Sequence, residues 1–118
     1  MIKLRDNDFY FTMEKLLYNK LNMGAIKRDL VDVSYLRSAS KTYTLVKFAK
    51  ENDLDVVMGF TSIAHKKRED LNYERIYGVD ELEGMPRKSV VIDEGIPSSK
   101  LKTIKENGHN LVTGYYCS

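Results

Sequence analysis

Residues 30–52 read LVDVSYLRSASKTYTLVKFAKEN, and this stretch predicts a buried strand, a tight loop and an amphipathic helix in succession. The apolar, β-branched residues of 30–33 are typical of a strand. From Thr42 to Asn52 the apolar residues recur at helical spacing, and the charged residues fall on the other face. The expected buried positions of this helix are Leu45, Val46, Phe48 and Ala49. The apolar run at 55–60 predicts a second strand, so residues 30–60 form a βαβ unit. The rest of the chain can be described relative to this unit.

The remaining sequence alternates apolar runs with helical patterns. Strands are predicted at 55–60 (DVVMGF), 74–77, 89–94 (SVVIDE) and 110–116 (NLVTGYY). Helices are predicted at 62–71 and 98–107, with one helical turn at 79–82. This alternation predicts an α/β protein with a three-layer αβα arrangement and a small, mainly parallel sheet.

A helix is also predicted before the first strand, over residues 8–21, with Asp8 as its cap and Gly24 among the residues that end it. Its expected inward positions are Phe9, Met13, Leu16, Leu17 and Leu21. The chain of 118 residues is therefore expected to form a single domain over 1–118, in which 1–28 is an N-terminal helical segment.

The composition is that of an ordinary globular protein, with 42% hydrophobic and 31% charged residues. The net charge of +2, from 19 basic and 17 acidic residues, is too small to indicate a dedicated nucleic-acid-binding domain. The single cysteine, Cys117, cannot form an internal disulfide and fits a reducing compartment. No apolar run approaches the roughly 18 residues of a membrane span. We therefore expect a cytoplasmic protein with no membrane partner.

Lys41 and Thr42 stand where the predicted loop meets the helix. Phosphate-binding loops end in Gly-Lys-Ser/Thr, because backbone N–H groups and the helix N-terminus bind the phosphates, the lysine adds a positive charge and the hydroxyl binds Mg²⁺. Aligned on this pattern, the residues expected to contact a nucleotide are Arg37, Ser38, Ala39, Ser40, Lys41 and Thr42. Tyr35 and Ser40 occupy the two glycine positions, and side chains there disfavour the positive φ angles and close backbone approach that such a loop uses.

A second motif lies in the strand at 89–94, which ends in Asp93 and Glu94. In phosphoryl-transfer sites an aspartate at such a strand end holds magnesium, and a neighbouring glutamate activates the attacking water. We therefore assign Thr42 and Asp93 to a metal site and Glu94 to catalysis. Thr113, in the last predicted strand, is a further cofactor-binding candidate near the γ-phosphate. An ordinary buried strand with an acidic exit is the alternative interpretation of Asp93 and Glu94.

In this order, the segments LVDVS, RSASKTYTLVKFAKEN, VVMGF, SVVIDEG and LVTGYY resemble the small P-loop NTPase-like proteins of phages and prophages of Gram-positive bacteria. The resemblance covers most of the chain from Arg28 onward. It implies a truncated RecA-like core with a degenerate Walker A motif and a Walker B motif. It also implies an ATP site with Mg²⁺, in which Lys41, Thr42, Asp93 and Glu94 are the functional residues, and a host cytoplasm as the place of action.

Three functional hypotheses follow. The first is a nucleotide-binding protein, a weak ATPase-like accessory protein of a phage. The second is a catalytically inactive P-loop-like fold that binds a host or phage factor of replication or defence. The missing glycines favour this second hypothesis, as do the aromatic residues of the N-terminal helix, Phe9, Tyr10, Phe11 and Tyr18. The third is nucleic-acid binding through Arg37 and residues 66–68, against which the slight net charge argues.

Overall fold

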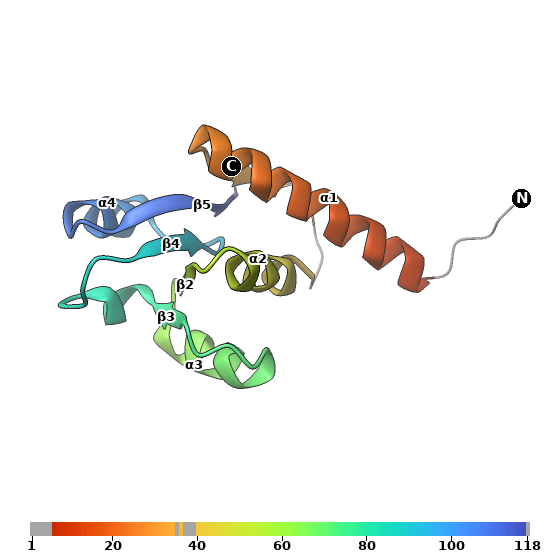
Figure 1. The fold of residues 1–118 in the computed structure, drawn as a ribbon. Helices are drawn as coiled ribbons and strands as arrows, with labels where there is room; N and C mark the ends of the chain where they lie inside the picture. The colour runs from red at the N-terminus through yellow and green to blue at the C-terminus, as the bar shows by residue number, and fades with distance from the viewer. Residues whose placement is uncertain (1–5, 35, 37–39, 118) are drawn as a thin grey trace, which may run out of the picture.

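The computed structural model describes residues 6–34, 36 and 40–117, and for residues 6–12 it describes the backbone alone. This part of the chain forms a five-stranded sheet in which every pair of neighbouring strands is parallel (Figure 1). The strands are β1 (Val31–Asp32), β2 (Asp55–Met58), β3 (Ile76–Gly78), β4 (Ser89–Ile92) and β5 (Asn110–Tyr116). The helices are α1 (Asp6–Lys27), α2 (Ser40–Glu51), α3 (Thr61–Asp70) and α4 (Ser98–Glu106), with a 3₁₀ turn, η1 (Val79–Leu82). The predicted α/β class with a parallel sheet is confirmed.

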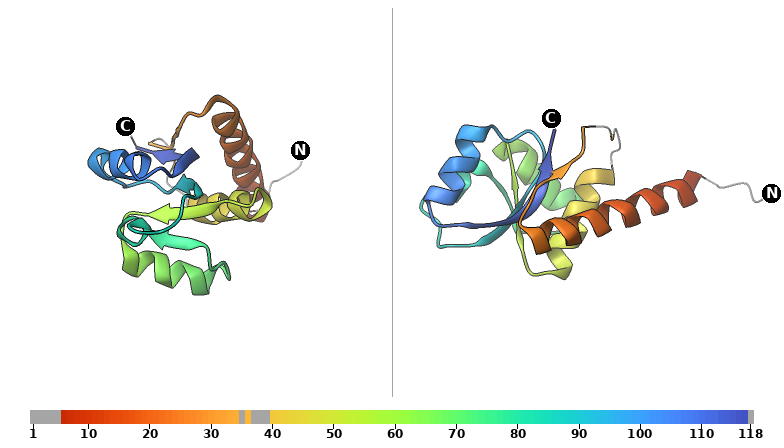
Figure 2. Two further views of the ribbon diagram at one scale, coloured as in Figure 1. Left: turned by 60° about the vertical axis from the view of Figure 1, so that its left-hand side comes forward. Right: turned by 90° about the horizontal axis from the view of Figure 1, so that it is seen from above.

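The strand order β1-β5-β4-β2-β3 accounts for the layers. The connections from β1 to β2 and from β2 to β3 move one way across the sheet, and those from β3 to β4 and from β4 to β5 move back. Because such crossovers are right-handed, α2 and α3 are expected on one face, and η1 and α4 on the other. The views of Figure 2 agree with this arrangement, with α1 packed on the face that α2 covers. Helices on both faces give the predicted αβα layout.

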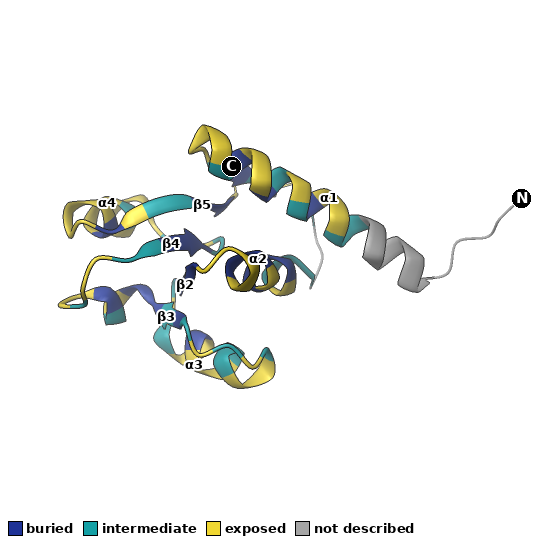
Figure 3. Ribbon diagram, in the orientation of Figure 1, coloured by how far each residue is buried: buried dark blue, intermediate teal, exposed yellow. Residues whose placement is uncertain are grey.

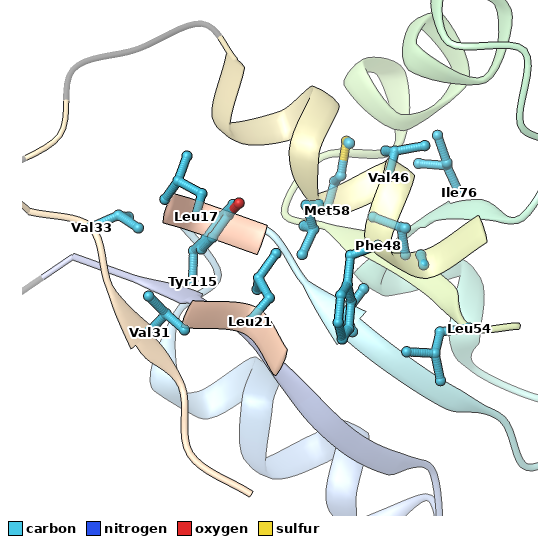
Figure 4. Packing of buried hydrophobic residues seen from close by; sticks show 14 of the residues in the cluster. Leu17, Leu21, Val31, Val33, Val46, Phe48, Leu54, Met58, Ile76 and Tyr115 are labelled. Carbon is cyan, nitrogen blue, oxygen red and sulfur yellow. The ribbon is translucent and has the colours of Figure 1, made fainter. Parts of the chain in front are cut away.

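The hydrophobic core consists of two clusters, one on each face of the sheet. The larger cluster lies under α1, α2 and α3 and includes Val56 of β2. Figure 4 shows Leu21, Phe48 and Tyr115 of this cluster. In the smaller cluster, under η1 and α4, Val57 packs with Ile92 and Ile104. Val56 and Val57 are neighbours in β2, so their side chains point to opposite faces. All four predicted inward positions of α2 are buried: Leu45, Val46, Phe48 and Ala49.

Helix α1 is longer than predicted, and Gly24 lies inside it. A Cβ atom on Gly24 would lie only 2.4 Å from Thr113 Oγ1 and 2.8 Å from the carbonyl oxygen of Asp29. The glycine is therefore needed for the close packing of α1 on β5. The helix ends beyond it, where Arg28 adopts a positive φ of 59° and the N–H of Asp29 donates to the Gly24 carbonyl. Asp8 also lies within the helix, so its predicted role as the cap is wrong.

The inward face of α1 is only partly as predicted. Leu17 and Leu21 are buried, but Leu16 is 45% exposed, because the residues that face the sheet are those in line with Gly24 (Figure 3). Tyr18 packs its ring edge-on against Phe48 and donates a hydrogen bond to Glu51. Its ring therefore serves the contact between α1 and α2 and offers little surface to a partner. The side chains of Phe9, Tyr10 and Phe11 lie outside the described residues.

Replacing Gly24 by alanine tests the close packing. In a free helix this change is favourable by about 1 kcal/mol. Here we expect Gly24→Ala to destabilise the protein by about 1 to 3 kcal/mol, since the new methyl group overlaps the Asp29 carbonyl oxygen and the Thr113 hydroxyl. Urea unfolding measures the difference, with Asn22→Ala, at an exposed position of the same helix, as the control. An increase in stability for Gly24→Ala would contradict the packing described.

Candidate functional site

The first turn of α2 contacts the end of β4 at the carboxyl edge of the sheet. Lys41 Nζ lies 2.6 Å from Glu94 Oε1, and Thr42 Oγ1 donates a 3.0 Å hydrogen bond to Asp93 Oδ2. The carboxyl ends of parallel strands meet at one edge, where the helices that follow them begin. The structure therefore brings together Lys41, Thr42, Asp93 and Glu94, as the sequence predicts.

Backbone hydrogen bonds with Val57 and Glu94, as well as the one from Thr42, fix the position of Asp93. Its N–H donates to the Val57 carbonyl at 2.9 Å, which continues the β4–β2 ladder past the last residue of β4. Its Oδ1 accepts a 2.9 Å hydrogen bond from the N–H of Glu94. Burial raises the pKa of the Asp93 carboxyl, and the hydrogen bonds from Glu94 and Thr42 offset this only in part. The position therefore disfavours the charged form of the Asp93 carboxyl, and a cation bound there would offset that effect.

Lys41 is the most restricted cation of the site. Besides Glu94, its ammonium group donates a 2.9 Å hydrogen bond to the carbonyl of Leu36. The side chain of Lys41 is only 12% exposed, whereas that of Glu94 is 33% exposed. An anionic ligand at Lys41 would thus compete with Glu94 for the same ammonium group.

Tyr115 belongs to this site, although the sequence predicts for it only a place in a strand. Its hydroxyl donates a 3.0 Å hydrogen bond to the carbonyl of Lys41, from a side chain that is 1% exposed. Burial raises the pKa of Tyr115, and the negative charges of Asp93 and Glu94 add to this effect. The alternation of β5 places Tyr115 on one face of the sheet, but nothing in the sequence indicates that this face meets the first turn of α2.

Thr113 lies apart from the Lys41–Glu94 contact. It pairs with Val91, two residues before Asp93, and its hydroxyl donates a 2.7 Å hydrogen bond to the carbonyl of Asp29. This contact fastens β5 to the segment between α1 and β1. Ser40 is the first residue of α2 and is half-buried. Three further predicted nucleotide contacts, Arg37, Ser38 and Ala39, lie outside the described residues, as does Tyr35.

The oxygen atoms of Thr42 and Asp93 are the candidate metal ligands. Among the described residues, no group of three or more His, Cys, Asp or Glu side chains is arranged to hold a metal ion. Mg²⁺ prefers oxygen ligands, keeps several waters and commonly binds through one or two carboxylates together with substrate phosphates. One carboxylate and one hydroxyl that are already in hydrogen-bond contact fit a Mg²⁺ ion that arrives with a phosphate ligand.

The basic run of α3 is partly used within the fold. Arg68 donates to the carbonyl of Ile76 at 2.6 Å and pairs with Glu81, which His65 also contacts. Glu81 in turn accepts a hydrogen bond from the N–H of Gly78. These contacts join α3 to β3 and η1. Within this run, Arg68 and His65 therefore have a structural role.

The chain matches no family model, no curated protein sequence and no solved structure. None of the helices in the described part of the chain has both the length and the apolar character needed to cross a bilayer. The class that the structure establishes is therefore that of a compact α/β protein with a small parallel sheet.

The raised pKa of Asp93 leads to a prediction about stability. A carboxyl with a higher pKa in the folded state makes the wild-type protein more stable as the pH falls through that pKa toward the unfolded value, which is about 4. Asp93→Asn removes this half-buried charge, and the amide can still accept from the Glu94 N–H and donate to Thr42 Oγ1. We expect the variant to be the more stable at pH 7, with a difference that shrinks toward acidic pH.

Urea unfolding of both proteins between about pH 4.5 and 8 measures this difference. Asp70→Asn, at an exposed position of α3, is the matched control and should show no such trend. A variant that is less stable than the wild type at pH 7 would mean that the Asp93 charge is stabilised in the ligand-free fold.

Proposed function

We propose that the protein binds a nucleoside triphosphate, with ATP as the candidate, at the carboxyl edge of its sheet. On this proposal it is a P-loop NTPase-like accessory protein of a phage or prophage, with a weak ATPase activity in the host cytoplasm. The observation that carries the proposal is the contact of Lys41 and Thr42, at the start of α2, with Asp93 and Glu94, at the end of β4. It unites the two sequence motifs in one site.

The start of α2 has the electrostatics of an anion site. The first N–H groups of a helix have no partner within the helix, and they carry its positive dipole end. The first turn of α2 contains no acidic residue, and Lys41 adds a positive charge there. Because Ser40 occupies the second glycine position of the motif, where a Cβ hinders the backbone, we expect the affinity to be weaker than that of a loop with both glycines.

Glu94 gains its proposed role when a phosphate displaces it from Lys41. In the ligand-free protein the ammonium group of Lys41 neutralises Glu94. A phosphate that binds Lys41 leaves the carboxylate free to accept a proton from water, whose oxygen attacks the γ-phosphorus while the bond to the leaving diphosphate breaks. A bound Mg²⁺ would neutralise charge on the phosphates. Thr42 and Asp93 would hold the ion.

Two substitutions in the site separate binding from catalysis. Lys41→Ala should weaken binding of ATP with Mg²⁺ by about 10- to 100-fold, the usual effect of losing a hydrogen bond between charged groups. Glu94→Gln should bind at least as tightly as the wild type, because the competing carboxylate is gone, and should not hydrolyse ATP. Isothermal titration calorimetry and single-turnover hydrolysis measure the two properties.

The matched control is Lys47→Ala, on the exposed face of the same helix, which removes an equal charge and should leave both properties unchanged. No binding of ATP by the wild type, or equal affinities for the wild type and Lys41→Ala, would exclude a nucleotide site at the start of α2. A loss of affinity in Glu94→Gln would show that Glu94 supports the ligand and does not compete with it.

A further inference from the structure

Helix α1 carries a second apolar face, opposite the one that packs on the sheet. Leu16, Met23 and Ile26 are exposed by 45%, 50% and 77%, respectively, and we call them the outer stripe. Their spacing of seven and three residues puts them within about 80° of arc on an α-helix. Residues at such spacing form the seam along which two helices pack. Single exposed apolar residues are common, but a stripe along one helix indicates a contact surface.

A groove of about 390 Å³ lies beside the outer stripe, between α1 and the edge strand β1. Leu16 and Met23 form part of its helix wall, and Leu30 and Val31 form part of its strand wall. Within the described part of the chain, β1 is the first strand in the sheet order and pairs with β5 alone. The edge of a sheet is a surface on which further chain can pack.

The charges of the two walls are of opposite sign. The helix wall carries Lys20 and Lys27, and the strand wall carries Asp29 and Asp32. In a dimer with twofold symmetry, a residue that contacts a second residue of the partner is matched by the reverse contact. If α1 of each copy lies in the groove of the other, the lysines of each helix wall face the aspartates of the opposite strand wall.

We propose that the protein forms a twofold symmetric homodimer through the outer stripe of α1 and the groove beside β1. The complementary charges of the two walls favour a second copy of this chain as the occupant. The outer stripe runs from Leu16 to Ile26, about 15 Å along the axis of α1, and the groove beside it adds apolar surface from Leu30 and Val31. The dimer does not depend on nucleotide binding, because the groove does not include Lys41, Thr42, Asp93 or Glu94.

Sedimentation velocity of the full chain, from 1 to 200 µM at low salt, tests the proposal. The wild type should be dimeric in the upper part of this range, with weaker association at high salt. Met23→Asp buries a carboxylate in the interface and should weaken association at least tenfold. Ile63→Asp, at a position of α3 that is 48% exposed, makes the same kind of change away from the groove and should leave association unchanged.

Charge reversal supplies a second, independent test. Lys20→Glu/Lys27→Glu and Asp29→Lys should each associate more weakly than the wild type, because like charges then face each other in the dimer. An equimolar mixture of the two variants should associate more tightly than either alone, since the new glutamates then face the lysine at position 29 and the retained lysines face Asp29 and Asp32. Circular dichroism of each variant establishes that its fold is retained.

A wild type that is monomeric at 200 µM overturns the proposal. Association that survives Met23→Asp unchanged, or that is weakened equally by Ile63→Asp, overturns it as well. If Met23→Asp does not fold, the mixture of charge-reversed variants decides, and a mixture no tighter than its components excludes the twofold arrangement.

Discussion

The hydrogen bond from Thr42 to Asp93 ties the helix that follows β1 to β4, the central strand of the sheet. β1 is only two residues long and lies at the edge, so the start of α2 needs other contacts to hold its position. Lys41 provides two of them, with the side chain of Glu94 and, through its carbonyl, with the hydroxyl of Tyr115. The start of α2 is thus fixed by contacts with two strands, β4 and β5, and these contacts hold its N–H groups and Lys41 at the carboxyl edge.

At Asp93, the cost of removing the carboxylate from water opposes the stabilisation that its hydrogen bonds provide. Burial disfavours the charge of Asp93, and Thr42 and the Glu94 N–H recover only part of that cost. A fold selected for stability alone would more simply place a neutral residue at this position, because removing a charge from water is costly even where hydrogen bonds recover part of the cost. A cation bound at Asp93, such as the proposed Mg²⁺ ion, would offset this cost. Buried polar groups with raised pKa values are found preferentially at functional sites.

Helix α1 shows how one residue decides the use of a whole surface. Gly24 lets the helix axis approach Thr113 and the Asp29 carbonyl, and this turns Leu17 and Leu21 toward the sheet. The orientation of α1 that buries these leucines leaves Leu16, Met23 and Ile26 exposed on its outer side, next to the edge strand. The sequence predicts a helix that packs on the sheet through one apolar face. In the structure α1 has two such faces, and only the one with Leu17 and Leu21 is buried within the chain.

The sequence by itself determined the order and type of the elements, because apolar periodicity reports local burial: every predicted element from residue 30 onward is present within two residues of its expected bounds. It also determined that Lys41, Thr42, Asp93 and Glu94 would meet, since parallel strands end at one edge. Only the tertiary structure decided the contact of Tyr115 with Lys41, the use of the Thr113 hydroxyl by Asp29 and the passage of α1 beyond Gly24. Each of these depends on how closely elements distant in sequence approach one another, and a local pattern of residue types carries no information on that distance.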